Sequence, residues 1–277
     1  MTMSLQSTLT IAPNVEMPIV GLGVFRAGPG DGTVGAVLHA LRTGYRHIDT
    51  ASIYRNEEEV GAALRTSEVA RDEIFVTTKL WNDDHGYDEA RHAFDRSLET
   101  LGVAQVDLYL IHWPVPEKRK DSWRALEAIF ADGQARAIGV SNYTQRHLTE
   151  LLDQAKVPPA VNQVECHPFL PQTGLRAFCA AQGITVQAYS PLTKGKRLDD
   201  PTLQSVATKH GRTAAQVLLR WGIEQNLVIL PKSSNPQRID DNAAIFDFAL
   251  DESDHEALGG LADDENGRTA WDPTAIE

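Results

Sequence analysis

Four residues whose side chains suit proton transfer are spread over the first half of the chain: Asp49, Tyr54, Lys79 and His112. Three of them come where a stretch with strand character ends, and Tyr54 follows the first of these stretches in a short loop. Barrel enzymes carry their active sites at the carboxyl ends of the strands, so side chains from several strand ends can meet in one place. An acid, a phenol, an amine and an imidazole would then form a single site.

The chemistry that this set suggests is general acid catalysis by the tyrosine. A phenol has an ordinary pKa of about 10, which is too high for easy proton exchange near neutral pH. A nearby ammonium stabilises the phenolate and should lower that pKa, and a carboxylate beside the amine keeps the amine charged. We therefore expect Tyr54 to donate a proton with support from Lys79 and Asp49, while His112 orients a carbonyl oxygen. A positioned general acid contributes about 10²–10⁴-fold in rate.

Each of the four residues also has a structural explanation when it is taken alone. Asp49 would serve as a cap or an ion-pair partner, Tyr54 as an amphipathic cover for its loop, and His112 as a structural histidine. Lys79 would serve as a surface charge, or as a Schiff-base amine as in barrel aldolases. Only the conjunction of the four favours a catalytic site.

The elements that must position these residues form a repeat along the chain. Amphipathic stretches end at a glycine and pass directly into a strand-like run, and each glycine fits the left-handed position that ends a helix. Four junctions of this kind in the same register indicate repeated βα units. The predicted helices cover 34–44, 88–102, 121–133 and 173–183, and end at Gly44, Gly102, Gly133 and Gly183.

The rest of the chain completes a closed barrel rather than two domains. Further helices are predicted at 56–65, 144–153, 201–210 and 213–224, and further strands at 18–25, 160–165 and 227–231. We therefore predict an α/β fold, a (β/α)₈ TIM barrel that forms a single domain over 1–277. Segment 4–12 and residues 15–17 are expected to form a short N-terminal β-hairpin that closes the barrel bottom. Asn56, with Glu59 three residues later, resembles a capping box that pins the Tyr54 loop.

An open doubly wound sheet is the rival fold. It would carry a G-x-G-x-x-G loop between a strand and a helix. Gly21 and Gly23 are the only candidates, and the third glycine comes late, at Gly28. We interpret this segment as a bend at a strand end.

Composition restricts the classes of function. The net charge of −12 over 277 residues argues against a nucleic-acid binder and a basic membrane-surface protein. No apolar run reaches about 18–20 residues, and residues 1–12 lack a signal peptide pattern, so we expect a cytoplasmic monomer. Cys166 and Cys179 show no zinc spacing and are interpreted as buried apolar residues in a reducing compartment. Because no His-x-His or His/Asp cluster has ligand spacing, no metal site is predicted.

Several motifs resemble those of the aldo-keto reductase superfamily. They follow in order over nearly the whole chain, and the tail and short length are most similar to the prokaryotic 2,5-diketo-gluconate reductase branch. The motifs are GYRHIDTASIYRNEEEVG at 44–61, LYLIHWP at 108–114, IGVSNY at 138–143, NQVECHP at 162–168, YSPL at 189–192 and LPKSSNPQRI at 230–239, together with the strand that ends in Lys79.

The resemblance implies a barrel enzyme that reduces aldehydes or ketones, such as α-dicarbonyls, keto-sugars or small aldehydes, with hydride from NADPH. This would be an NADP-dependent oxidoreductase acting on CH–OH groups. Tyr54 would be the general acid, supported by Lys79 and Asp49, and His112 would position the carbonyl. Two alternatives remain: a non-catalytic barrel that senses NADPH, and a Schiff-base lyase that uses Lys79.

A cofactor site is expected after the last strand. Asn235 is a plausible N-cap and Pro236 a plausible first residue of a short helix. A helix N-terminus flanked by Lys232 and Arg238 suits an anion, and barrels often bind phosphate at this place. By resemblance, Lys232, Ser233, Asn235 and Arg238 would hold the 2′-phosphate of NADP(H), with Gln237 at a position where glutamate is commoner.

The resemblance also assigns residues along the rest of the cofactor. Tyr189 would stack on the nicotinamide, and the carboxamide would meet Ser141, Asn142 and Gln163. Ser190 and Leu192 would lie along the pyrophosphate, and Asn242 near the adenine.

The substrate pocket is expected to be aromatic. Its predicted lining is Phe25, Trp81, Trp113 and Trp271. Since the chain ends soon after Trp271, without the long C-terminal loop of larger family members, we expect an open pocket and relaxed specificity.

Overall fold

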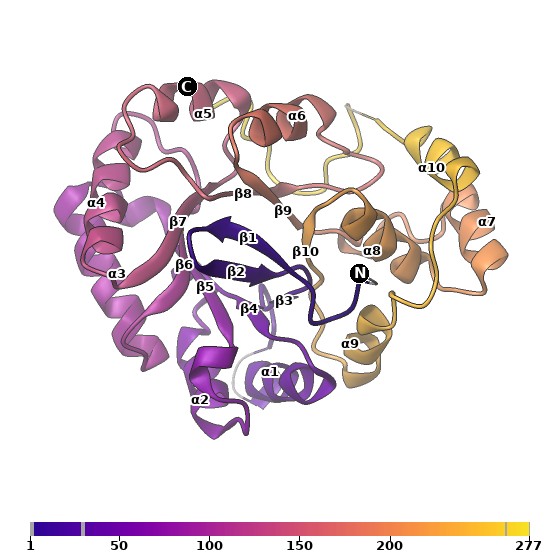
Figure 1. Ribbon diagram of the computed structural model, residues 1–277, viewed down its shortest axis with the longest axis horizontal. Coiled ribbons are helices and arrows are strands. Elements are labelled where there is room, and N and C mark those ends of the chain that lie inside the picture. Colours follow the sequence, from indigo (N-terminus) through magenta and orange to yellow (C-terminus); the bar gives the residue numbers. More distant parts are fainter. Residues whose placement is uncertain (1–2, 29–30, 264, 277) are drawn as a thin grey trace.

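Eight parallel strands form the centre of the molecule. The computed structural model describes residues 3–28, 31–263 and 265–276. The strands lie in the order β10-β9-β8-β7-β6-β5-β4-β3, so each one pairs with its neighbour in sequence, and helices surround them (Figure 1). This is the (β/α)₈ barrel that the repeat predicts. The strands are β3 (Leu22–Gly23), β4 (His47–Asp49), β5 (Phe75–Leu80), β6 (Val106–Ile111), β7 (Ala135–Ser141), β8 (Val161–Glu165), β9 (Thr185–Tyr189) and β10 (Val228–Leu230).

The predicted helices are all present, with small shifts at their ends. Gly44, Gly102, Gly133 and Gly183 have positive φ, as a residue that ends a helix in the left-handed region requires. The four helix–glycine–strand junctions are therefore confirmed. The helices are α1 (Asp31–Thr43), α2 (Glu57–Thr66), α3 (Tyr87–Leu101), α4 (Arg119–Ala131), α5 (Gln145–Leu152), α6 (Thr173–Ala181), α7 (Pro201–His210), α8 (Ala214–Glu224), α9 (Pro236–Ala243) and α10 (Glu252–Gly259).

The N-terminal hairpin closes one end of the barrel. Strand β1 (Thr8–Ala12) pairs antiparallel with β2 (Val15–Pro18), and the pair crosses the middle of the strand ring in Figure 1. Met17 is fully buried in an apolar cluster with Leu108 and Val161 from the barrel strands. The hairpin therefore plugs the barrel at the amino ends of its strands, as expected.

The first barrel strand is shorter than the sequence suggests. Only Leu22–Gly23 is regular, although 18–25 reads as one apolar run, and the ring closes through isolated bridges from Val20 to Ile229 and from Gly23 to Lys232. A Cβ at Gly21 would lie 2.8 Å from Cγ of the His47 ring. The glycine therefore allows a close approach of this segment to β4, and it does not form a pyrophosphate loop.

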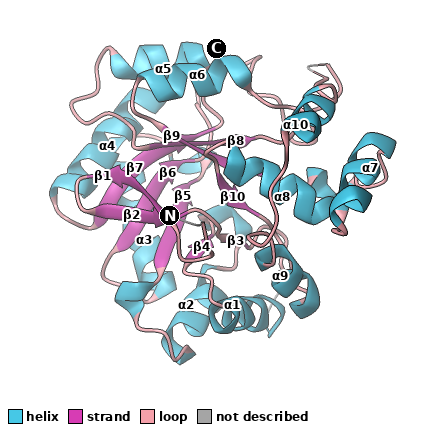
Figure 2. Ribbon diagram, turned by 45° about the vertical axis from the view of Figure 1, so that its right-hand side comes forward, coloured by secondary structure: helices cyan, strands magenta, loops and turns pink. Residues whose placement is uncertain are grey.

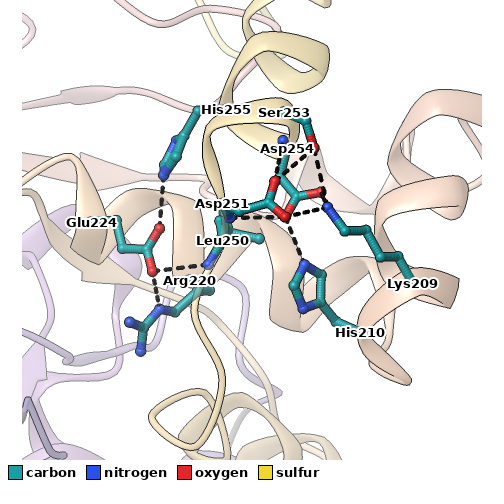
Figure 3. A network of polar contacts seen from close by, with 9 residues as sticks. All are labelled: Lys209, His210, Arg220, Glu224, Leu250, Asp251, Ser253, Asp254 and His255. Carbon is teal, nitrogen blue, oxygen red and sulfur yellow. Dashed lines mark hydrogen bonds and ion pairs between the residues drawn. The ribbon is translucent and has the colours of Figure 1, made fainter.

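Helix α10 is not among the predicted helices. Of its side chains only Asp254 and Leu258 are buried, so it lacks the apolar period that reveals a helix in sequence. Its docking is polar: Asp254 accepts hydrogen bonds from Lys209 at 2.8 Å and from His210 at 2.7 Å (Figure 3). In Figures 1 and 2 it lies with α7 at one edge of the molecule.

The core has two layers. A large apolar cluster fills the space between strands and helices, and a smaller one fills the barrel interior near the hairpin. Cys166 and Cys179 are free and buried, as expected. No helix within the described ranges combines the length and apolar character that a membrane crossing requires.

Candidate active site

A buried ion pair lies at the carboxyl end of the barrel. Lys79 Nζ, at the end of β5, donates to Asp49 Oδ1 at 2.6 Å and to the Thr50 carbonyl at 2.8 Å. The Lys79 side chain has no exposed surface. Burial lowers the pKa of Lys79, and the Asp49 carboxylate opposes that shift. An amine with two acceptors and no exposure is poorly placed to attack a carbonyl, which argues against Schiff-base chemistry.

Tyr54 lies beside this pair in the turn after β4. Lys79 Nζ sits 5.1 Å from the centroid of its ring, so the ammonium faces the π system. No hydrogen bond joins Lys79 to the Tyr54 hydroxyl among the residues described. Burial raises the pKa of Tyr54 well above 10, and Asp49 adds to the shift. The expected lowering of this pKa is therefore wrong, because burial and the Asp49 carboxylate both disfavour the phenolate.

His112 completes the group from the end of β6. Its ring lies 5.7 Å from the ring of Tyr54 and 5.3 Å from that of Trp81. Burial, together with Lys79, holds the pKa of His112 well below 6.5, so the imidazole is neutral. Its Nδ1 is buried and makes no hydrogen bond to the described residues. A neutral imidazole has one N–H, and that proton is better placed on Nε2.

The Tyr54 loop is pinned, but not by the expected cap. Asn56 precedes α2 without making a side-chain cap. Its amide donates to the Val24 carbonyl at 2.9 Å, and its oxygen accepts from the Thr50 hydroxyl at 2.8 Å. The capping-box interpretation is therefore wrong, since Asn56 ties the loop to neighbouring strand ends instead.

The residues expected near the nicotinamide lie together on neighbouring strand ends. Asn142 takes a left-handed backbone, with φ of 63°, just after β7. Its amide nitrogen donates to the His112 carbonyl and to Ser141 Oγ, both at 3.0 Å, and its oxygen accepts from the Tyr189 hydroxyl at 2.8 Å. Gln163, from β8, donates to Asp49 Oδ2 at 2.7 Å. The predicted proton-transfer and nicotinamide groups therefore share one hydrogen-bonded site.

The expected phosphate loop follows β10 and leads into α9. Asn235 caps this helix by accepting from the Arg238 backbone N–H at 3.0 Å, and Pro236 is its first residue. Ser233 is buried, while Lys232 and Arg238 are exposed. Although the Lys232 side chain is exposed overall, partial enclosure of its amine and the Arg238 charge lower the pKa of Lys232, so two cations face one region. An anion bound there would relieve their repulsion.

Three further residues predicted to contact cofactor lie around the same end. Ser190 follows β9 with φ of 48°. Its carbonyl accepts a hydrogen bond from the Thr193 N–H at 2.8 Å, and this bond closes a turn. Leu192 is half-buried in that turn, and Asn242 is buried in α9.

The four predicted pocket residues form two groups of aromatic contacts, one with Tyr54 and His112 and one between the two tryptophans Trp113 and Trp271. Phe25 is 45% exposed and lies 4.9 Å from the Tyr54 ring, while Trp81 contacts His112. Trp113 is buried, and Trp271 packs against it with ring centroids 5.8 Å apart, although Trp271 remains 70% exposed. The aromatic lining therefore includes a wall supplied by the C-terminal tail.

Other polar residues that sequence reasoning missed support the site from inside the barrel. Gln187 lies two residues before Tyr189 and is fully buried, as is His47, two residues before Asp49. The two-residue period of a strand, which places alternate side chains on one face, was the available signal. Glu165 was also missed; it accepts from the backbone N–H groups of Thr269 at 2.8 Å and Ala270 at 2.9 Å in the tail.

A hollow of about 290 Å³ at the opposite end of the barrel is a weaker candidate. It is lined by residues that include Arg46, Asp107 and Arg136. Arg136 pairs with Asp107 at 2.8 Å, and Arg71 pairs with the same carboxylate at 3.1 Å. These charges already have partners. Across the described part of the chain, no group of three or more His, Cys, Asp or Glu side chains could hold a metal ion.

Comparison with known proteins agrees with the barrel fold and identifies the family. Residues 21–263 match the model of the aldo/keto reductase family. The chain is 49% identical over 265 residues to a glyoxal reductase of Bacillus subtilis (strain 168), covering 96% of each protein. Among solved structures, it resembles an aldo-keto reductase enzyme from a Medee basin deep-sea metagenome library, with a TM-score of 0.91 and 43% identity, over 95% of this chain and 97% of that one.

A Bombyx mori aldo-keto reductase in complex with NADP is also similar, with a TM-score of 0.85 and 37% identity over 92% of both chains. The family match spans far more than half of the sequence, and the identities lie well above 30%. The narrower resemblance to the 2,5-diketo-gluconate reductase branch stays a prediction. The chain belongs to the aldo/keto reductase family.

Proposed function

We propose that this protein is an NADPH-dependent reductase that converts small aldehydes, α-dicarbonyls or keto-sugars to alcohols, with Tyr54 as the proton donor. The observation that carries the proposal is the buried contact of Lys79 Nζ with Asp49 at 2.6 Å, directly beneath the Tyr54 ring and next to a neutral His112. Bound NADPH would supply hydride to the carbonyl carbon.

The residues of this chain would handle the carbonyl oxygen. His112 Nε2 would donate to that oxygen and orient it, because the ring is neutral and its Nδ1 is enclosed. Tyr54 would deliver its proton as negative charge grows on the oxygen. Its raised pKa keeps the phenol protonated at neutral pH, so the donor is loaded before reaction. The Lys79 ammonium beneath the ring would stabilise the negative charge that the phenol acquires as the proton leaves.

The chain's own groups fit the cofactor. Lys232, Arg238 and the N-terminus of α9 offer positive charge and backbone donors for the 2′-phosphate, and Ser233 lies between them. At the other end Tyr189 offers a ring for the nicotinamide, close to Asn142 and Gln163. Ser190 and Leu192, in the turn after β9, would lie along the pyrophosphate, and Asn242 would lie near the adenine. The NADP-bound relative from Bombyx mori supports NADP(H) as the cofactor.

The aromatic mouth supports a small carbonyl substrate. Phe25 and Trp81 contact Tyr54 and His112, and the paired rings of Trp113 and Trp271 would extend this apolar lining. Two of these rings stay well exposed, Phe25 at 45% and Trp271 at 70%, which favours an open pocket with relaxed specificity. The glyoxal reductase relative makes α-dicarbonyls the first substrates to test.

The decisive experiment measures NADPH oxidation against a panel of aldehydes, α-dicarbonyls and keto-sugars, for the wild type and for Tyr54→Phe. The variant keeps the ring over Lys79 and removes only the hydroxyl. We expect it to lose about 10²–10⁴-fold in kcat while it retains NADPH affinity. Equal turnover by the two proteins would refute Tyr54 as the proton donor.

The same assay separates the two alternative functions. Tight NADPH binding with negligible wild-type turnover on every carbonyl would indicate a sensing barrel. Borohydride trapping of a substrate on Lys79 in the absence of NADPH would indicate a lyase, contrary to the burial of that amine.

A further inference from the structure

A buried carboxylate that the proposed mechanism does not use lies beside the strand that carries Lys79. Glu57 is the first residue of α2, three positions after Tyr54, and is 6% exposed. Its Oε1 accepts a hydrogen bond from the Thr78 hydroxyl at 2.6 Å, and its Oε2 accepts one from the Ser97 hydroxyl at 3.3 Å. Both partners are uncharged, so among the residues described this carboxylate has no hydrogen-bonded counter-ion.

Strand geometry places Glu57 on the outer side of β5. Successive side chains of a strand point to opposite faces, so Thr78 and Lys79 point in opposite directions. Lys79 reaches Asp49 inside the barrel, while Thr78 reaches Glu57 in the layer where α2 and α3 pack. The carboxylate of Glu57 and the ammonium of Lys79 therefore belong to the two sides of one strand.

The surroundings of Glu57 favour its ionised form in spite of burial. It stands at the N-terminus of α2, where free backbone N–H groups and the helix dipole stabilise a negative charge. Burial raises the pKa of Glu57, and the Thr78 and Ser97 hydroxyls and the Lys79 charge oppose that rise. Burial lowers the pKa of Lys79, and Asp49 and Glu57 oppose that fall. Glu57 and Lys79 thus each reduce the cost of burying the other's charge.

Inside the barrel, the other ionisable groups around Lys79 add no further charge at neutral pH. His47 and His112 are neutral because burial lowers the pKa of each ring, to about 4 in His47 and well below 6.5 in His112. Tyr54 keeps its proton because burial raises its pKa well above 10. Beyond its hydrogen-bonded carboxylate, the ammonium therefore has Glu57 as its second anion.

Outside the barrel, Tyr109 of β6 faces Glu57 from the neighbouring strand. Its buried hydroxyl makes no hydrogen bond to a described residue, and burial raises its pKa well above 10, so it is uncharged. The charged residues in and before α3 act on Tyr109 rather than on Glu57 or Lys79; they are Asp84, Asp95 and Arg96. The interaction of Glu57 with Lys79 is therefore not offset from this side.

We propose that Glu57 is a positioning residue of the reductase site and acts through Lys79, as a second negative charge that holds the amine in its ammonium form beneath Tyr54. The inference rests on the proposed function, in which that ammonium stabilises the charge that the phenol acquires as its proton leaves. It adds a residue from outside the barrel to the groups that set the charge of Lys79.

The titration of Lys79 tests the proposal directly. Carbon-13 NMR of the full chain, labelled at the lysine Cε and free of cofactor, follows this amine, and Lys79→Met identifies its signal. Glu57→Gln keeps the size of the side chain and removes its charge. Lys79 should then lose its proton about one pH unit lower than in the wild type, since an opposite charge no longer favours the ammonium. An unchanged titration would overturn the proposal.

Two variants are matched controls for charge and for geometry. Glu58→Gln removes the same charge from the next residue of α2, which is exposed, and should leave the Lys79 titration in place. Thr78→Val removes the 2.6 Å hydrogen bond but keeps the Glu57 charge, so it should move the titration far less than Glu57→Gln. Equal shifts in Thr78→Val and Glu57→Gln would mean that Glu57 only holds β5 in place, and the proposal would fail.

The catalytic consequence appears in the pH profile of kcat for NADPH-dependent reduction. The basic limb of this profile belongs to the coupled Tyr54 and Lys79 groups, and it should move to lower pH in Glu57→Gln by about the same one unit, with NADPH affinity retained. Absence of wild-type turnover on every carbonyl would refute the proposed function, and with it the catalytic part of this inference. An active Glu57→Gln with an unmoved limb and an unmoved Lys79 titration would refute this inference alone.

A measurement on the wild type tests the proposal if Glu57→Gln does not fold. Carbon-13 NMR of the glutamate Cδ should find the Glu57 carboxyl ionised at pH 7 and above, and Glu57→Asp, which keeps the charge, identifies the signal by its loss. A Glu57 carboxyl that is still protonated at pH 8 would overturn the proposal, because an uncharged group cannot hold the ammonium.

Discussion

Lys79 donates to Asp49 at 2.6 Å inside the barrel, and neither charge has another ionised partner among the hydrogen bonds that the two side chains make. Lys79→Met should therefore leave a buried carboxylate without a counter-ion, which typically costs about 3–5 kcal/mol. We expect this loss in the free energy of unfolding, measured by urea denaturation at pH 7. If Lys79→Met were as stable as the wild type, the result would contradict a stabilising ion pair between Lys79 and Asp49.

The double variant separates stability from catalysis. Asp49→Asn combined with Lys79→Met removes both charges, so most of the lost stability should return. Turnover should not return, because the ammonium beneath Tyr54 is still absent. Recovery of activity together with stability would show that the pair is only structural.

Acidification should destabilise the protein through His47. The folded-state pKa is about 4 and the ordinary value is 6.5, so only the unfolded chain binds this proton between those values. The stabilisation is complete above pH 6.5 and is lost as pH falls through 4, with a total on the order of 3 kcal/mol. His47→Gln should flatten the dependence of unfolding free energy on pH by one proton in this window. The variant should still keep a residual slope of the same sign, because His85 also has a pKa lowered to about 4.

The same residues show how far sequence reasoning reaches. The barrel was predictable because glycine-ended helices are local signals, and the site was predictable because parallel strands bring their carboxyl ends together. The direction of the Tyr54 pKa shift was not predictable, since it depends first on how completely the phenol is buried, which only packing decides. The buried hydrogen bond between Gln163 and Gln187 was not predictable either, since it depends on the register between β8 and β9. Helix α10 was not predicted because charged side chains, rather than an apolar face, hold it against α7.

The docking of α10 predicts a stability change without a catalytic one. Asp254 is 3% exposed in its side chain and accepts from Lys209 and His210, as Figure 3 shows. Asp254→Ala should lower the free energy of unfolding by about 1–3 kcal/mol, because His210 and the Asp251 backbone N–H lose their acceptor, while Lys209 keeps Asp251. kcat should stay unchanged, since the contacts join α10 to α7. Asp247→Ala is the control: its carboxylate pairs with Arg212 but is 63% exposed, and its loss should cost under about 1 kcal/mol.

The C-terminal tail should control substrate binding through Glu165. Although burial alone raises its pKa, hydrogen bonds from His167, Thr269 and Ala270 lower the pKa of Glu165 to about 2, so a buried carboxylate holds the tail that carries Trp271. Glu165→Gln replaces one carboxylate oxygen with an NH₂ group. The change weakens three of the hydrogen bonds that Glu165 accepts, and it turns a donor toward the N–H and O–H groups of the tail. We expect KM for aromatic aldehydes to rise several-fold with a smaller change in kcat, and limited proteolysis to cut the tail sooner.

A matched control keeps the charge and removes one contact. Thr269→Val deletes only the hydroxyl bond to Glu165 and preserves the backbone N–H bond at 2.8 Å, so KM should rise less than in Glu165→Gln. Because Lys194 also binds the Thr269 carbonyl at 2.7 Å, the tail is held on both sides of one residue. Unchanged KM and unchanged proteolysis in Glu165→Gln would mean that contacts nearer the end, such as that of His147 with the Ile276 carbonyl at 2.9 Å, suffice to place Trp271.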